Sequence, residues 1–229
     1  MNKLTKTLVG ASAAGMLVAS LAACSSPSAS GTETGASSAP ASSAAAQPEP
    51  LASIPKLSGK DTQVTLDADF GAALASLKLT PGVLGSATLT DGVLAFPITG
   101  GNVDYYDPAA DYRPYVQGEI DHVGSGISLT AGDTVVELTD FVIDPGTSRL
   151  TGTVTVNGKV AGEDVFIFNL DGSTLKPLET DSDGNAVLEG TRVLISADAA
   201  PLLNDTFGTD AIKPDMLVGI AKITAAAAS

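Results

Sequence analysis

The sequence predicts an all-β domain, an antiparallel β-sandwich-like fold with two short helices, over residues 52–229. Two observations predict this class. Apolar and small polar residues alternate along several segments, and turn dipeptides recur between these segments at the spacing typical of hairpins. With 44% hydrophobic residues in 229, the chain can form one globular domain even if its first residues contribute nothing to the core.

Residues 1–23 have the layout of a signal peptide, because Lys3 and Lys6 precede an apolar run that ends in small residues. The following LAAC, residues 21–24, resembles the lipobox of bacterial lipoproteins, whose cysteine is lipidated and begins the mature chain. We therefore expect Cys24 to hold the protein to a lipid bilayer, on the extracellular face of the cell membrane. A short transmembrane anchor and an ordinary secretory peptide with an incidental cysteine are the alternatives.

Residues 24–51 follow as a lipidated cysteine and a disordered tether, since serine, alanine and proline dominate and large apolar side chains are missing until the end. Removal of the signal peptide takes away Lys3 and Lys6. It leaves 10 basic against 26 acidic residues, a net charge of −16. A domain this acidic repels phosphate backbones, so we expect no binding to nucleic acid.

The first elements of the domain are predicted to be a helix and a hairpin. In DADFGAALASLKL, Phe70, Leu74 and Leu77 recur at helical spacing, with Asp67 or Asp69 as the cap of a helix that extends to about residue 79. Apolar and small polar residues alternate over residues 86–98, on both sides of an Asp-Gly dipeptide at 91–92. This pattern predicts two strands joined by a tight hairpin turn.

Further strands are predicted downstream. Residues 126–143 form two β-rich runs around a turn at 131–133, and Asp-Pro-Gly at 144–146 ends the second. Residues 149–156 alternate, with threonines on one face and Leu150, Val154 and Val156 on the other. An Asn-Gly turn then leads to a strand over residues 165–170.

The end of the chain is predicted to contain a second helix and a last strand. In SADAAPLLNDTFG, Ser196 or Asp198 can cap the helix, Leu203 and Phe207 share a face, and Gly208 ends it. We expect both helices to cover the core of the sheet. The last strand is predicted over residues 216–224, with a frayed alanine-rich end.

Residues 104–122 contain all four tyrosines of the chain, its only histidine and one of its three arginines. The prolines and aspartates of residues 107–114 predict an ordered loop between strands. Three roles remain open for the tyrosines. Tyr105 or Tyr106 contacts a ligand near His122, the rings pack on the rim with their hydroxyls in water, or they contact a protein partner.

His122 itself is predicted to be a hydrogen-bonded structural residue or a binding residue. On a strand, Asp121 points to the opposite face, so it cannot orient the imidazole as the acid of a catalytic dyad would.

Five stretches resemble the HtaA-type domain, a secreted or surface-anchored β-rich module of actinobacteria associated with haem uptake. They are FGAALASL, TDGVLAFPITGG, EIDHVGSGISLT, TDFVIDPGTSRLTGTV and VLISADAAPLLNDTFG. The resemblance implies a β-sandwich-like fold outside the membrane and haem as a candidate cofactor. It also implies an axial tyrosine in the first helical segment, supported by a strand histidine at the place of His122. Residues 70–79 contain no tyrosine, which departs from the pattern of the family, so the candidate tyrosines for contact with a ligand near His122 are Tyr105 and Tyr106.

Motifs that carry catalysis are missing from the sequence. It has no Gly-x-Ser-x-Gly elbow, no histidine pair for a metal and no phosphate-binding loop, so we expect no enzyme.

Asp181, Asp183 and Asn185 have the spacing of a calcium loop. However, the glycine is misplaced and Arg192 stands where a bidentate glutamate is needed, which favours a solvated turn.

Two functions remain. The first is a surface lipoprotein that binds haem or a similar flat apolar molecule. The second is a structural or adhesive surface module with a surface protein as partner.

Overall fold

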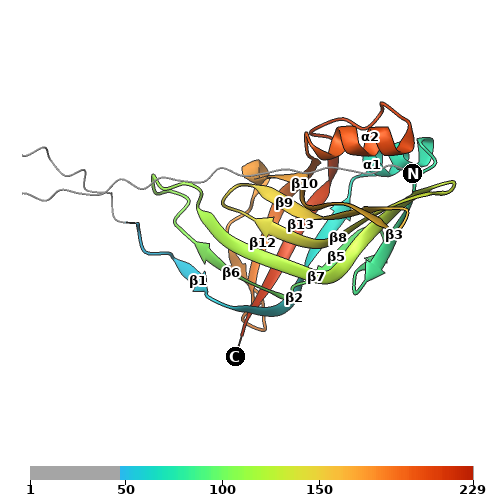
Figure 1. The fold of residues 1–229 in the computed structure, drawn as a ribbon. Helices are drawn as coiled ribbons and strands as arrows, with labels where there is room; N and C mark the ends of the chain where they lie inside the picture. Colours follow the sequence, from blue (N-terminus) through green and yellow to red (C-terminus); the bar gives the residue numbers. More distant parts are fainter. Residues whose placement is uncertain (1–46, 229) are drawn as a thin grey trace, which may run out of the picture. The chain divides into compact units, whose positions relative to one another are not determined.

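The computed structural model describes residues 47–228, and it confirms the predicted all-β class (Figure 1). An antiparallel sheet accounts for most of the domain, and two short helices accompany it. The predicted signal peptide, Cys24 and most of the predicted tether lie outside the described residues. None of the helices within residues 47–228 has the length and apolar character needed to cross a bilayer.

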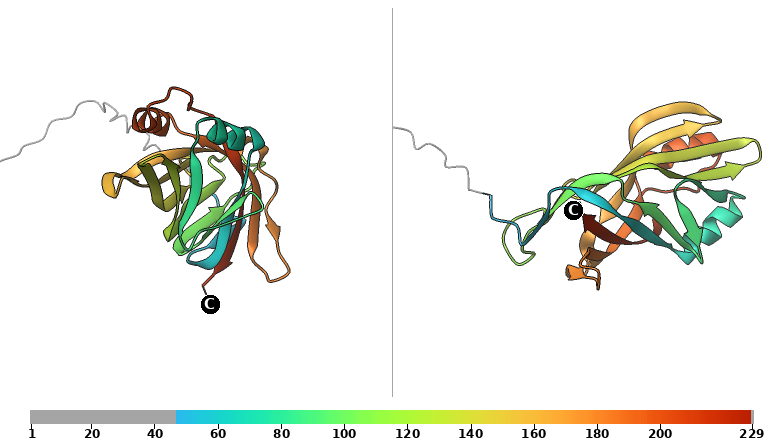
Figure 2. Two further views of the ribbon diagram at one scale, coloured as in Figure 1. Left: turned by 90° about the vertical axis from the view of Figure 1, so that its right-hand side faces the viewer. Right: turned by 90° about the horizontal axis from the view of Figure 1, so that it is seen from below.

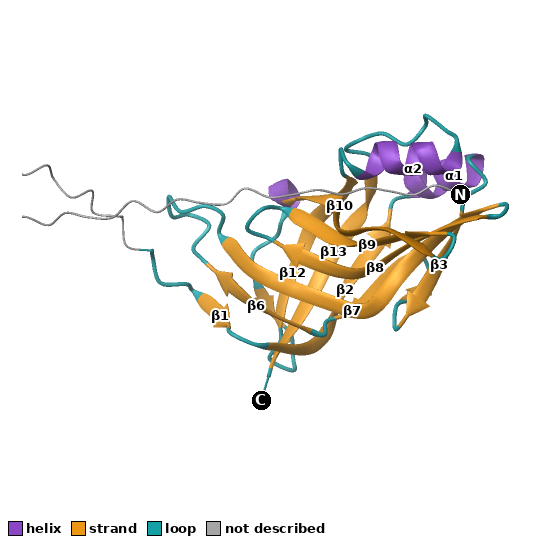
Figure 3. Cartoon of the chain, in the orientation of Figure 1, coloured by secondary structure: helices purple, strands orange, loops and turns teal. Residues whose placement is uncertain are grey.

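The elements in chain order are β1 (Ala52–Ile54), β2 (Leu57–Leu66), α1 (Ala68–Ser76), β3 (Thr80–Gly85), β4 (Thr88–Thr90), β5 (Val93–Pro97), β6 (Gly100–Tyr105), β7 (Val116–Ala131), β8 (Thr134–Asp144), β9 (Arg149–Val156), β10 (Lys159–Asp171), the 3-10 turn η1 (Gly172–Thr174), β11 (Glu179–Thr180), β12 (Ala186–Ile195), α2 (Ala199–Phe207) and β13 (Leu217–Ala227). Figure 3 shows that strands form the body of the domain and that the helices lie to one side of it.

The strands are hydrogen-bonded in the order β1-β6-β7-β8-β9-β10-β12-β13-β2-β5-β4, with β3 added beside β7 and β11 beside β12. The sheet is strongly curled, as two further views show (Figure 2). Its two margins meet where the chain passes from β5 to β6. There the Ile98 amide donates to the Lys60 carbonyl and the next amide, of Thr99, donates to the Asp121 carbonyl. The curl therefore brings β2 next to β7 and encloses a concave interior.

The predicted hairpin turns are confirmed. Asp91 and Gly92 have φ of 51° and 79°, and Asn157 and Gly158 have φ of 50° and 76°. Two successive residues with positive φ are the mark of the type I′ turn, whose twist suits a two-residue connection between antiparallel strands.

Two strands extend further than predicted. β10 begins at Lys159 rather than 165, because irregular pairing with β9 accommodates the polar residues between Val160 and Val165. β13 continues to Ala227, so the predicted fraying is wrong: Ala225, Ala226 and Ala227 pair with β2. Alanine has a low preference for strands, so pairing with β2 and the burial of Ala225 hold this end of β13 in place.

Both predicted helices form. The Asp67 carboxylate accepts from the amides of Asp69 and Phe70, which caps α1 as predicted. For α2 the cap comes from Ser196, whose hydroxyl accepts from the Ala199 amide, whereas Asp198 makes no such bond. Gly208 ends α2 in the left-handed conformation. The helices lie at one end of the curled sheet, and the β6–β7 loop lies at the other (Figures 1 and 2).

Candidate functional site

The interior of the curled sheet contains a cavity of about 480 Å³, here called the large cavity. Side chains from both margins of the sheet line it, together with the β6–β7 loop, residues 106–115. Its walls are mainly aliphatic and aromatic, with Phe96, Phe141 and Phe168 as the largest apolar groups. Volume and lining are those of a site for a small molecule of apolar character.

His122 lies on the wall of this cavity and is only 1% exposed. Its Nε2 is 2.9 Å from the Thr62 hydroxyl, so the imidazole connects β7 to β2 across the joined margins of the sheet. Phe96 packs edge-on against the ring at 6.4 Å between centroids. Thr62, and not Asp121, is thus the partner of the imidazole, as expected for adjacent strand residues that point to opposite faces.

Burial lowers the pKa of His122 to about 4, because the protonated ring would lose most of its hydration. The Phe141 and Ile120 backbone and the Asp61 carboxylate oppose this shift without cancelling it. The imidazole is therefore neutral at physiological pH. Its Nδ1 is shielded from water and has no hydrogen-bond partner within residues 47–228.

The two candidate tyrosines, adjacent in sequence, lie on opposite sides of the chain. Tyr105, the last residue of β6, is 8% exposed and lines the large cavity. Tyr106 is 2% exposed and does not line it. Its ring packs on Tyr112 with 4.7 Å between centroids, and its hydroxyl accepts from Gln47. The structure therefore brings Tyr105 and His122 to one cavity and leaves Tyr106 outside it.

The β6–β7 loop contributes two residues that the sequence did not single out. Tyr115 lines the cavity and meets Tyr105 edge to face, with 5.9 Å between the ring centroids. Arg113 also lines the cavity, with its guanidinium carbon 5.5 Å from the Tyr115 ring centre. Burial, followed by the neighbouring Tyr105, raises the pKa of Tyr115, while Arg113 acts in the opposite direction.

The loop starts from closely paired strands. Gly118 in β7 has a φ of 118°, and a Cβ there would collide with the Asn102 carbonyl oxygen of β6. Only glycine permits this approach, which holds Tyr105 opposite Val116 at the base of the loop. No periodic pattern could reveal Tyr115 and Arg113 as lining residues, because loop side chains have no fixed face.

The end covered by the helices has a much smaller cavity, of about 50 Å³, here called the small cavity. Phe70, Leu74 and Leu77 of the α1 region and Leu203 of α2 fill this end. The residues that line both cavities form a partition between them: Leu94, Ile127, Phe168 and Val218. The predicted role of the helices as covers is in accord with this packing, and α1 does not reach the large cavity.

The loop with calcium-like spacing is internally hydrogen-bonded. The Asp181 carboxylate accepts from the amides of Asp183 and Asn185 and from the side chain of Asn185. These bonds lower the pKa of Asp181, with the Asn185 side chain as the first cause. The carboxylate therefore organises the turn between β11 and β12.

Neither the family models nor the curated proteins contain a match to this chain. Among solved structures, the chain is similar to the C-terminal domain of HtaA from Corynebacterium glutamicum. The TM-score is 0.51 at 13% sequence identity, with 74% of this chain and 97% of that chain covered. A domain-swapped dimeric variant of the same domain matches with a TM-score of 0.41 at 14% identity, over 69% of this chain and 90% of that one. The resemblance inferred from the sequence is thus confirmed at the level of the fold.

Proposed function

We propose that this chain is a cell-surface lipoprotein whose curled-sheet domain binds a small apolar molecule in the large cavity, with haem or a similar flat molecule as the candidate. The observation that carries the proposal is the large cavity itself, whose volume of about 480 Å³ falls within the range of about 300 to 1,000 Å³ typical of ligand sites. A hollow of this size in an apolar interior is costly for a protein that has no use for it.

The mainly apolar wall of the cavity suits a flat ring such as a porphyrin, and Tyr105 and His122 are the residues that would hold it. The neutral imidazole has a buried nitrogen without a partner among the residues described, and the Tyr105 ring stands at the loop side of the same cavity. Haem would supply the porphyrin and iron chemistry, while the chain supplies apolar walls, exclusion of water and one polar contact.

The lipid anchor and the surface location are supported by the sequence alone. The lipobox-like LAAC around Cys24 and the acidic composition are typical of an exposed lipoprotein. We expect a Cys24→Ser variant to move from the membrane fraction to the soluble or secreted fraction. Recovery of the unmodified chain from the cytosol would contradict this part of the proposal.

The binding function is tested by a titration with hemin. We expect the full chain carrying Cys24→Ser, which removes the lipidation site, to shift the Soret band in a saturable way. Tyr105→Phe should weaken this binding if the hydroxyl contacts the ligand. Tyr106→Phe is the matched control, because it removes the hydroxyl of the neighbouring residue that points away from the cavity.

The absence of any Soret shift in folded protein would contradict haem as the ligand. An equal loss of binding in both tyrosine variants would contradict a contact between the Tyr105 hydroxyl and the ligand. A general apolar ligand would still be detected by displacement of a neutral fluorescent probe such as N-phenyl-1-naphthylamine.

A structural or adhesive surface module remains the second candidate. The observation in its favour is the sequence of α1, ADFGAALAS, which offers no tyrosine and packs at the small cavity. This candidate predicts that neither hemin nor the neutral probe binds and that the soluble domain retains a surface component in a pull-down experiment.

A further inference from the structure

The ionised groups of this chain are distributed unevenly between its surface and the large cavity. The chain has 26 acidic residues, yet none of the described residues that line the cavity is aspartate, glutamate or lysine. Arg113 is the one charged side chain among them, since His122 is neutral. An acidic protein thus presents a single cation to whatever enters this cavity.

Arg113 is held in place by its own loop. Its guanidinium donates to the carbonyls of Ala110, Tyr112 and Pro108 at 2.7, 2.8 and 2.9 Å. These bonds use three of the five N–H donors of the side chain. The Nε donor and one Nη2 donor have no acceptor within residues 47–228, and no carboxylate there forms an ion pair with Arg113. The cation is therefore fixed in place, exposed to solvent and without a counter-ion in the described part of the chain.

The polarity of the lining changes from Arg113 inward. The Tyr115 ring lies 5.5 Å from the guanidinium, and Tyr105 follows at 5.9 Å from Tyr115. Beyond these rings the wall is formed largely by side chains such as Ile143, Leu150 and Phe168. A molecule that matches this sequence of groups has an apolar body and an anionic group at one end.

We propose that the ligand of the large cavity is an amphipathic carboxylate, whose apolar body lies inside the sheet and whose carboxylate is bound by Arg113. This inference rests on the proposed function, because it specifies the chemistry of the molecule bound there. Guanidinium and carboxylate form strong charge-assisted hydrogen bonds, and a guanidinium already fixed by its loop loses little conformational freedom on binding. A cationic ligand would find no acidic partner on the wall, and a neutral one would leave Arg113 without a role.

The test compares two ligands of equal length that differ only in the head group, dodecanoate and dodecan-1-ol. Each competes with N-phenyl-1-naphthylamine for the full chain carrying Cys24→Ser. We expect the carboxylate to bind more tightly than the alcohol by about tenfold or more, since a hydrogen bond to a charged group contributes this much. Added salt should weaken the binding of dodecanoate and leave dodecanol unchanged.

Variants then assign the preference to Arg113. We expect Arg113→Gln to remove the preference for dodecanoate, and Arg113→Lys, which keeps the charge but not the planar fork, to retain part of it. Arg149→Gln is the matched control, because Arg149 also stacks on an aromatic ring, Phe166 at 4.5 Å, but neither residue lines the cavity. Arg113→Gln binds neither ligand if the substitution disrupts the loop. In that case the preference of Arg113→Lys for dodecanoate over dodecanol tests the proposal.

The outcomes separate this inference from the proposed function. Equal affinity for dodecanoate and dodecanol would overturn the carboxylate as the ligand group, and an unchanged preference in Arg113→Gln and Arg113→Lys would overturn its binding by Arg113. Either result would leave the proposal of an apolar binding site intact. Failure of the neutral probe, both dodecyl ligands and hemin to bind would overturn both. A hemin titration of the same variants distinguishes the sources of the carboxylate. A loss of hemin affinity in Arg113→Gln places a porphyrin carboxylate at the loop, whereas unaltered hemin binding beside altered dodecanoate binding assigns Arg113 to linear carboxylates.

Discussion

The two ends of the curled sheet differ in what covers them. At one end, α1 and α2 supply Phe70, Leu74 and Leu203, and only about 50 Å³ remains open between them and the sheet. At the other end, the β6–β7 loop borders about 480 Å³. Seven strands contribute side chains to both cavities, so these strands by themselves do not explain the difference. They are β2, β5, β7, β8, β10, β12 and β13. A helix places an apolar side chain over the sheet every three or four residues, whereas the β6–β7 loop lines the large cavity with Arg113, Pro114 and Tyr115.

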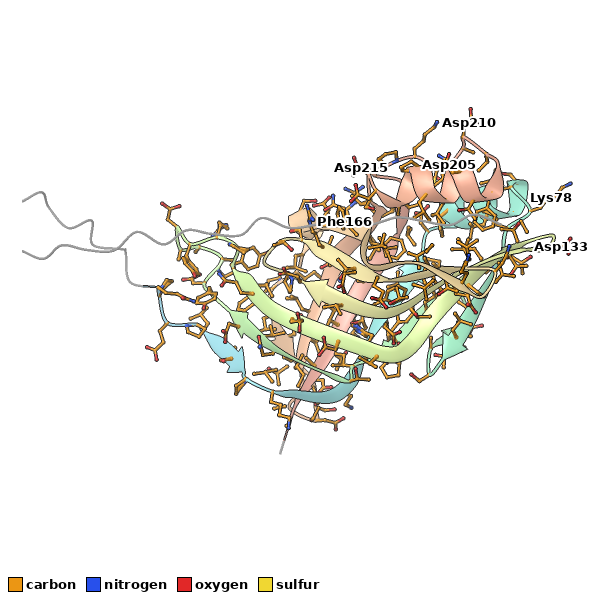
Figure 4. All side chains as sticks on the ribbon, in the orientation of Figure 1. Lys78, Asp133, Phe166, Asp205, Asp210 and Asp215 are labelled. Carbon is orange, nitrogen blue, oxygen red and sulfur yellow. The ribbon has the colours of Figure 1, made fainter. Side chains whose placement is uncertain are left out.

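The comparison separates stability from binding. The helix end is packed in the manner of an ordinary protein core, where a loss of volume is costly and added volume is not tolerated. The loop end has an apolar wall around an unfilled cavity. Substitutions there should therefore affect ligand binding more than the stability of the fold. Figure 4 shows the corresponding surface of the helix end, where Asp205, Asp210 and Asp215 project outward around α2 and carry part of the negative charge.

The largest expected effect comes from removal of a side chain at the helix end. Leu203→Ala should lower the free energy of unfolding by about 2 to 5 kcal/mol, because Leu203 is buried between α2 and the sheet. Leu178→Ala, at a half-buried position on the wall of the large cavity, should cost about 1 kcal/mol. Chemical denaturation of both variants measures the difference, and equal losses would show that the two ends are packed alike.

The second effect is a pH dependence that belongs to the loop end. The pKa of His122 is lowered from 6.5 to about 4 in the folded chain, so the unfolded chain takes up the proton first as pH falls. The contribution of His122 to stability is complete above pH 6.5 and is lost between about pH 6.5 and pH 4, in total about 3 kcal/mol.

Denaturation curves over this pH range measure that loss, with His122→Gln as the reference that lacks the titrating group. Between pH 6.5 and pH 4, the free energy of unfolding of this variant should fall by about 3 kcal/mol less than that of the wild type. An identical pH profile for both proteins would mean that the imidazole is hydrated in the folded state.

The third effect concerns added volume. Ala200→Leu, at a position 1% exposed in α2, should destabilise the domain by about 1 to 3 kcal/mol through overpacking. Ala221→Leu, on the wall of the large cavity, should cost less than that and should weaken binding of N-phenyl-1-naphthylamine. A larger cost for Ala221→Leu than for Ala200→Leu would reverse the comparison between the ends.

The smallest effect distinguishes the caps of the two helices. Asp67→Ala should cost about 1 kcal/mol, because its carboxylate accepts two amides at the start of α1. Asp198→Ala should be close to neutral, since the Ser196 hydroxyl and not Asp198 accepts the first amide of α2. Thermal unfolding resolves this difference, and a matching loss in Asp198→Ala would assign the cap to the aspartate.

The strands that could be predicted are those with their own local signal. Asp91-Gly92 and Asn157-Gly158 specify their hairpins, because these residues tolerate the positive φ that a type I′ turn requires. By contrast, β2, LSGKDTQVTL, was not predicted, since its polar residues conceal the alternation. It forms in the middle of the sheet because β13 and β5 pair with both of its edges.

Ligand binding by Tyr105, Tyr106 and His122 stays a prediction, and the structure decides only their positions. Tyr105 and His122 do line one cavity, and Tyr106 does not. Adjacent strand residues point to opposite faces, but the sequence could not say which face of β6 is concave. Arg113 and Tyr115 belong to the segment 104–122, but the sequence predicts no role for them, because a loop position acquires its neighbours only from the fold.

The sequence by itself determined the class of the domain, its hairpin turns, the two helices and the concentration of tyrosines, histidine and arginine near one loop. Each of these depends on residues close together in the chain, through backbone conformation or periodic burial. Only the tertiary structure decided that the sheet curls until Thr62 meets His122, that the curl encloses a cavity, and that Arg113 borders it. The physical reason is that a hollow is bounded by side chains far apart in sequence, and their separation depends on the pairing of the whole sheet.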